Sequence, residues 1–411
     1  MAARIFTNTA RCMQRLGYLK HLAHLAASRE TSNFETLGKE LIQSATHRVT
    51  VSVTPEIKSY IHRRLTDRVY NDLKKKLGPN ATGQGPDSVS LEIQDVYLAS
   101  DSLPSRTGKL VLGDWRKYTL LGTLLGLVRE GTYSALVRGI SLLKLCSNRE
   151  RIAFAKYVSD CNPFAISPSQ ALFLLYCFIE RDGDVVRLLF RQILSHRHDS
   201  FSDREAGDYL PEVYREIERI ESKRNLTIEE REKLEKLLRM AESISKWKGK
   251  TYTGGGAREE AIRCRLEPYV DLGLLEKSDP FRYQYSLSNK GHAFFSTLVN
   301  CKDLPDFLQN RFFSACAPLF SKRPRHRKHI PTLVRALHKS WMELKSNLGY
   351  APILEISLLT LSRSISKTGF YFELTNSFEA LRQYQKEHPD CLRFTVDRMG
   401  NLAHVKFLKK P

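Results

Sequence analysis

Hydrophobic positions along the chain follow two periods, which together predict a mainly helical protein with a few short strands. Near the N-terminus, Val49, Val51 and Val53 alternate with polar residues, and this period of two is typical of a half-buried strand. The next residues suit a helix start, with an N-cap, a proline in the first turn and an early acid: Thr54, Pro55 and Glu56. Residues 46–65 are therefore predicted to form a strand followed directly by a helix.

This strand–helix order resembles the ribbon-helix-helix family of DNA-binding proteins, in which paired strands enter the major groove. The resemblance is confined to residues 46–65. It implies that three polar side chains of the strand face DNA: Arg48, Thr50 and Ser52. A strand and helix with a purely structural role is the alternative.

The middle of the chain, from about residue 110 to 194, has a helical period. Ser167, Pro168 and Gln170 form a capping box at a helix start. The Arg-Asp-Gly-Asp stretch at 181–184 predicts a turn, so residues 167–194 are expected to form a helical hairpin. Residues 209–246 are strongly charged and predict two further helices, either an extended arm or a hairpin that docks a partner.

A helix, a small hairpin and another helix are predicted between residues 262 and 298. Ile262, Leu266 and Tyr269 share one helical face, and Gly273 suits the left-handed position that ends a helix. Two short strands follow, and Ser288 caps the next helix. The stretches YVDLGLLEK (269–277) and NKG (289–291) resemble the winged-helix superfamily, which implies DNA binding or protein docking.

In DNA-binding winged helices the helix before the hairpin enters the major groove. Here, however, the face opposite Ile262 carries three acids, Glu260, Glu267 and Asp271, which would meet phosphates poorly. Backbone contacts or a protein partner are therefore expected in place of base reading. The basic residues assigned to nucleic-acid contact in this region are Lys246, Lys248, Lys250, Arg258, Arg263, Arg265 and Arg282.

A second unit of the same kind is predicted at the C-terminus. Asn376 or Ser377 is expected to cap a short helix, and strands at 392–396 and 403–408 flank a tip at Gly400. This again resembles a winged helix, with a small α+β domain that binds nothing as the alternative. The residues assigned to nucleic-acid contact are Arg382, Gln383, Lys386 and Arg398.

A basic run, KRPRHRKH, separates the two units at residues 322–329 and contains no acid. Such a run is suited to gripping phosphates. A nuclear localisation signal and a solvated linker are alternatives. The residues assigned to phosphate contact are Lys322, Arg323, Arg325, Arg327 and Lys328.

The charge balance supports a polyanionic partner. Among 411 residues, Lys and Arg number 65 and Asp and Glu number 45, for a net charge of +20. Residues 301–411 alone carry 19 basic and 9 acidic residues, so half of the excess lies in the last quarter of the chain. A concentrated basic excess favours nucleic acid as partner.

Other features bear on compartment. The eight cysteines form no C-x-x-C pair, which argues against a zinc site and suits a reducing compartment. The chain contains no run of about 18 apolar residues, so no membrane span is predicted. Residues 1–29 lack acids, which resembles an organelle transit peptide; an amphipathic helix of the mature fold is the alternative.

Catalysis is not expected. The His-Arg-His-Asp stretch at 196–199 and the acids Glu180, Asp182 and Asp184 lack partners at a recognisable spacing. No P-loop, nucleophile elbow or dinucleotide motif is present. The sequence therefore predicts no enzyme, no metal and no cofactor.

Together these patterns predict a multi-domain, mainly α protein with small β-hairpins. The expected parts are an α+β domain (1–105), a helical domain (106–200), a charged hairpin (201–248), a winged-helix-like module (249–320), a basic linker (321–329) and a second such module (330–411). The expected function is non-catalytic binding of double-stranded DNA, mainly through phosphates.

The setting expected for this function is a regulator, or an accessory subunit of a DNA-processing or prokaryotic antiviral defence assembly, with protein partner subunits. The compartment is the cytoplasm, at the nucleoid. Two alternatives stay open: a protein-interaction scaffold, and an organellar RNA-binding protein. The organellar matrix and the nucleus are the corresponding alternative locations.

Overall fold

The chain is mainly helical, and its described residues form four small sheets of two or three strands. This confirms the predicted class of a mainly α protein with small β elements. The computed structural model describes residues 15–29, 32–64, 67–78, 86–100, 115–154, 156–196, 200–222, 257–277, 283–327, 329–397 and 400–411, together with positions 228, 231, 232, 235 and 239. The second half of the predicted charged hairpin, 223–248, lies mostly outside these residues.

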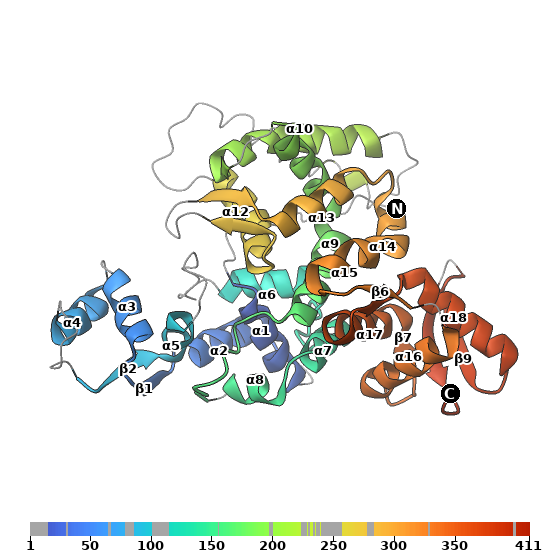
Figure 1. Cartoon of the computed structure of the whole chain (residues 1–411), viewed down its shortest axis with the longest axis horizontal. Coiled ribbons are helices and arrows are strands. Elements are labelled where there is room, and N and C mark those ends of the chain that lie inside the picture. Colours follow the sequence, from blue (N-terminus) through green and yellow to red (C-terminus); the bar gives the residue numbers. More distant parts are fainter. Residues whose placement is uncertain are drawn as a thin grey trace.

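The N-terminal lobe combines a two-stranded antiparallel sheet with short helices (Figure 1). Its elements are α2 (Phe34–Thr46), β1 (Arg48–Ser52), α3 (Pro55–Arg63), α4 (Arg68–Leu77), β2 (Ser88–Glu92) and α5 (Ile93–Ala99). The predicted strand and helix are confirmed, since Val51 is buried in β1 and the Thr54 side chain accepts a hydrogen bond from the Ile57 amide. The strand exposes Arg48, Thr50 and Ser52 but pairs with β2 of the same chain.

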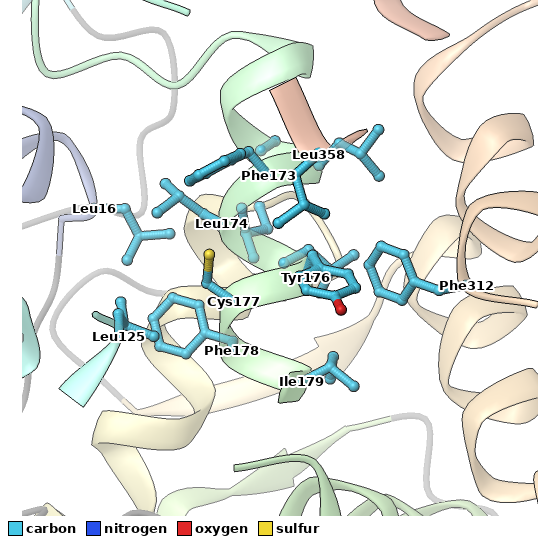
Figure 2. Packing of buried hydrophobic residues seen from close by; sticks show 14 of the residues in the cluster. Leu16, Leu125, Phe173, Leu174, Tyr176, Cys177, Phe178, Ile179, Phe312 and Leu358 are labelled. Carbon is cyan, nitrogen blue, oxygen red and sulfur yellow. The ribbon is translucent and has the colours of Figure 1, made fainter. Parts of the chain in front are cut away.

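The centre of the molecule is built around one long helix. The surrounding elements are α1 (Gly17–Ala27), α6 (Trp115–Leu124), α7 (Val137–Lys144), α8 (Asn148–Ala153) and α9 (Pro168–Ser195). Side chains of α9 point toward Leu16 and Leu125 on one side and toward Phe312 and Leu358 on the other (Figure 2). Segments from both ends of the chain therefore share a single hydrophobic core.

The turn predicted at 181–184 is wrong, because α9 continues through it for 28 residues. Asp182 and Gly183 are both buried on this helix. A Cβ atom on Gly183 would come within 2.7 Å of Leu304 Cδ2, so the glycine serves close packing and not a turn. The capping box of Ser167 and Gln170 is confirmed at the start of the helix.

A first unit with a three-stranded sheet follows α9 in the chain. It contains β3 (Phe201–Ser202), α10 (Asp203–Glu221), α12 (Ala257–Asp271), β4 (Leu275–Lys277) and β5 (Gln284–Leu287). The sheet is antiparallel in the order β3-β5-β4. The predicted hairpin and the left-handed Gly273 (φ 72°) are confirmed, whereas β3 comes from outside the predicted 249–320 range.

Three helices lead from the first unit to the next: α13 (Asn289–Val299), α14 (Leu304–Asn310) and α15 (Phe312–Phe320). As predicted, Ser288 caps α13, since its hydroxyl accepts a hydrogen bond from the Gly291 amide at 3.0 Å. A short strand follows, β6 (Arg325–His326), which lies within the predicted basic linker.

The C-terminal unit repeats the strand order of the first. It contains α16 (Ile330–Leu344), β7 (Ala351–Pro352), α17 (Ile353–Thr368), β8 (Phe370–Tyr371), α18 (Leu374–Glu387), β9 (Leu392–Val396) and β10 (Leu402–Phe407). Its sheet is antiparallel in the order β7-β10-β9. In both units a first strand precedes two of the labelled helices and a hairpin, and that first strand pairs with the last. The units differ between those helices: the C-terminal unit has strand β8 there, and the first unit has further helical positions between 228 and 239.

The acid-free N-terminal stretch takes part in this fold from residue 15 onward. Tyr18, Leu19 and Leu22 of α1 are buried in the main core, and Lys20 Nζ lies 2.7 Å from Glu150 Oε1. Residues 17–27 are therefore a helix of the fold, as the second of the two readings of this stretch expects. Among the helices of the described ranges, none combines the length and hydrophobicity needed to cross a bilayer.

Candidate nucleic-acid interface

The basic segment, residues 322–327, contains a two-residue strand, β6, and is exposed along most of its length. Its strand β6 pairs in parallel with β8, and two amides donate hydrogen bonds across the pair: Arg325 N to Gly369 O at 2.8 Å and Arg327 N to Tyr371 O at 2.7 Å. Gly369 has a φ of 74°, and a Cβ atom there would lie 2.2 Å from Arg323 O. The backbone of the basic segment therefore passes closely over the end of α17.

The side chains of the basic segment differ in availability. Lys322, Arg323 and Arg325 are exposed, and none forms an ion pair with another described residue. Arg327 is only partly exposed; its guanidinium lies 5.0 Å from the Phe370 ring centroid, and burial lowers its pKa. Three of the predicted phosphate contacts are thus free to meet a polyanion, and Arg327 is less so.

Helix α16 follows the basic segment in the chain and carries two further exposed cations. Arg335 and Lys339 are exposed and lie four residues apart, so they share one face of the helix. The pKa of His338 on the same helix is lowered, first by burial and then by the positive charges of Lys410 and Lys345. The sequence analysis did not assign Arg335 and Lys339, although their i,i+4 spacing and the absence of acids between 329 and 342 were available signals.

Helix α18 presents only its C-terminal half. Arg382, Gln383 and Lys386 are exposed there, as predicted. The first turn instead packs on α14, where the Thr375 hydroxyl donates to Asn310 Oδ1 at 2.7 Å. A partner would therefore meet the second half of this helix.

The predicted cap of α18 is wrong. The helix begins three residues early, with Glu373 as N-cap, and Ser377 is buried inside it and donates to Leu374 O. The Glu373 carboxylate also accepts hydrogen bonds from the Phe313 and Ser314 amides, at 3.1 and 2.7 Å, so it joins α18 to the start of α15. A carboxylate N-cap serving two helices was not visible in the sequence because α15 is remote in the chain.

Two arginines of α12 that were assigned to nucleic-acid contact, Arg263 and Arg265, instead form ion pairs within the chain. Arg265 is buried and its Nε lies 2.6 Å from Asp182 Oδ2 of α9. Burial opposes the charge of this guanidinium, but Asp182 and neighbouring groups hold its pKa above the usual value. Arg263 pairs with Asp203 and lies 3.6 Å over the Tyr283 ring. Arg265 cannot reach a phosphate, and Arg263 is engaged within the chain.

Two of the three acids on the face of α12 opposite Ile262 have partners within the chain. Glu267 Oε1 accepts hydrogen bonds from Lys277 Nζ at 2.9 Å and from the Tyr285 hydroxyl at 2.6 Å. Asp271 accepts a hydrogen bond from the Leu16 amide. The side chain of the third acid, Glu260, lies outside the described residues.

Seven of the assigned residues cannot be placed. Six lie outside the described residues: Lys246, Lys248, Lys250, Arg282, Lys328 and Arg398. Arg258 belongs to α12, but its side chain is likewise outside the description. Their assignment to nucleic-acid contact stays a prediction.

The acids considered for catalysis have structural roles. Glu180 pairs with Arg138, and Asp182 with Arg265. Within the described ranges, no group of His, Cys, Asp and Glu side chains is arranged to hold a metal ion. Burial raises the pKa of the Cys146 thiol to about 11 and that of Cys177 to about 12, so both stay protonated at neutral pH.

Comparison of the chain with known protein families, curated proteins and solved structures found no match.

Proposed function

We propose that this chain binds double-stranded DNA without catalysis, mainly through phosphates, by a positive surface on its C-terminal unit. One observation carries the proposal: five cations on a fixed backbone lie free of ion pairs with described residues. They are Lys322, Arg323, Arg325, Arg335 and Lys339. Such cations release counterions when they meet phosphates, which is the main source of affinity for DNA.

The connectivity of the two units supports a winged-helix reading. In both, a helix lies directly before the hairpin, and the first strand pairs with the last. In the C-terminal unit the helix before the hairpin exposes Arg382, Gln383 and Lys386 on the half that α14 leaves uncovered. Such a chain is suited to act as a regulator or as the DNA-holding subunit of a larger assembly.

Fluorescence anisotropy with a short generic duplex across a salt series tests the proposal. In one variant, Lys322, Arg323 and Arg325 are changed to Ala. A matched control removes three exposed lysines elsewhere, with Lys156, Lys290 and Lys302 changed to Ala. Each lost phosphate contact lowers the log–log salt slope by about 0.9, so we expect a drop of about 2–3 in the first variant and little change in the control.

Two results would overturn the proposal. Wild type that does not bind duplex at low salt has no phosphate-binding surface of this kind. Equal slopes in the variant and its control would assign any binding to bulk charge and not to this surface. Parallel titrations with single-stranded RNA decide between the partners, because tighter binding to RNA would replace DNA by RNA in the proposal.

A further inference from the structure

The N-terminal lobe repeats part of the connectivity seen in the two C-terminal units. It runs from α2 through β1, then through α3 and α4, and β2 returns antiparallel to β1. Helices α3 and α4 are joined by residues 64–67, a connection of the length found in helix-turn-helix pairs. The lobe also has its own hydrophobic cluster, which includes Ile57, Ile61 and Tyr70.

Helix α4 has one buried face and one exposed face. Tyr70 and Leu77 are buried. At 100° per residue, the exposed positions fall within an arc of about 120°. They are Arg68, Val69, Asp72, Lys75 and Lys76. Val69 is 48% exposed, an unusual fraction for a large apolar side chain in this molecule.

The charge of the lobe is concentrated on this helical pair. Residues 55–77, from the start of α3 to the end of α4, contain seven Lys and Arg residues and three acids. None of Arg68, Lys75 and Lys76 forms an ion pair with another described residue. The composition of the exposed face, three cations with one apolar and one acidic side chain, suits a surface that meets phosphates and base edges.

A buried polar cluster fixes the angle between α3 and α4. The Tyr60 hydroxyl donates to Asp95 Oδ1 of α5 at 2.8 Å, and the Tyr60 and Tyr70 rings meet edge to face with centroids 6.0 Å apart. The Arg64 guanidinium lies over both rings, at 5.8 and 5.3 Å. Burial raises the pKa of both tyrosines, so they keep their protons and continue to donate. These contacts join α4 to α3 and α5 through buried side chains.

The lobe and the C-terminal unit lie at opposite ends of the long axis of the molecule, with the central helices between them (Figure 1). The two positive surfaces are thus separated by the body of the protein. Granting the proposed function, we propose that α4 is a second duplex contact and that one chain bridges two DNA segments. The inference rests on the proposed function but adds a second site and a consequence that one site cannot produce.

A capture assay tests the bridge. One short duplex is immobilised on beads, the protein is bound at low density, and a fluorescent duplex is added. The α4 variant carries Ala in place of Arg68, Lys75 and Lys76; the control is again the variant with Lys156, Lys290 and Lys302 changed to Ala. Circular dichroism and urea midpoints verify that both fold, and light scattering gives the number of chains per complex.

We expect wild type and control to capture the fluorescent duplex, and the α4 variant to bind the bead duplex but to capture at least tenfold less of the second. Capture by the α4 variant equal to wild type would overturn the inference and assign bridging to self-association or another surface. Wild type that binds the bead duplex but captures nothing would also overturn it while leaving the proposed function intact. Wild type that binds no duplex would remove both.

Discussion

The two units α9–β5 and α16–β10 have the same strand order, and each places a helix directly before the hairpin. The two helices differ in how far they are buried. In the first unit, that helix is α12, and apart from Arg263 its side chains from Ile262 to Leu272 are buried. In the second unit it is α18, whose C-terminal half is open to solvent. The surroundings explain the difference, because α12 is enclosed by α10 and the segment before α1, whereas α18 packs on α16, α17 and α14 by one face and leaves Arg382, Gln383 and Lys386 in solvent.

An arginine on the helix before the hairpin therefore has a different role in each unit. Arg265 of α12 neutralises a buried carboxylate, and Arg382 of α18 faces water. Removing one partner of a buried pair leaves an uncompensated charge, whereas an exposed arginine has solvent as partner. We infer that the first unit is an element of the core and that the second is the one suited to a polyanion.

The largest expected effect comes from breaking the buried pair of the first unit. Asp182→Ala leaves the Arg265 guanidinium buried without its carboxylate and is expected to lower the free energy of unfolding by about 3–5 kcal/mol. Arg382→Ala, at the exposed helix, is expected to change it by no more than about 0.5 kcal/mol. Urea unfolding of both variants measures the contrast, and equal losses would contradict the different roles of the two helices.

The next largest effect is expected from replacing two glycines, one of which should change stability alone and the other both stability and duplex binding. A Cβ atom on Gly291 of α13 would lie 1.8 Å from Leu274 O of the first unit, and one on Gly369 of the second unit would lie 2.2 Å from Arg323 O of the basic segment. Either change to Ala forces backbone to move and is expected to cost about 1–3 kcal/mol. Only Gly369→Ala displaces the basic segment, so only this variant should weaken duplex binding, by several-fold, under conditions where both proteins are folded. Equal Kd values for the two variants would argue against the basic segment as the contact.

A smaller effect compares cations on the two helices directly. Arg382→Ala combined with Lys386→Ala is expected to lower the salt slope of DNA binding by about 2, since each contact contributes about 0.9. Arg263→Ala removes a cation that is already paired with Asp203, so its slope should equal that of wild type. A lowered salt slope for Arg263→Ala would indicate that α12 contacts DNA after all.

The smallest expected effect concerns Glu373, whose carboxyl group links α18 to the start of α15. Burial raises the pKa of the Glu373 carboxyl above its ordinary value of 4.5, although hydrogen bonds from the Ser314 and Phe313 amides oppose the shift. The folded state then holds this proton more tightly than the unfolded state, so the contribution is full below pH 4.5 and is lost as the pH rises through the raised value. Glu373→Gln should remove this small loss. A pH series of urea midpoints measures it, and a wild type that gains stability relative to the variant over this window would contradict the assigned direction.

Much of the local structure could be predicted because it depends on neighbours in the sequence. The alternation at Val49 and Val51, the cap at Ser288 and the left-handed Gly273 each depend on residues within one or two turns. The predicted turn at 181–184 failed for the opposite reason. Asp182 and Gly183 are typical of turns, but Arg265 and Leu304, far along the chain, hold them inside a helix.

The sequence by itself determined the helical class, the two hairpins and the concentration of positive charge toward the C-terminus. Only the tertiary structure decided which of those charges face solvent. Arg265 and Arg382 are alike in the sequence, since each lies in a helix before a hairpin. They differ because Asp182, 83 residues away, meets one of them within the core. A charge is buried only where a remote partner compensates its desolvation, and the position of that partner depends on the packing of the whole chain.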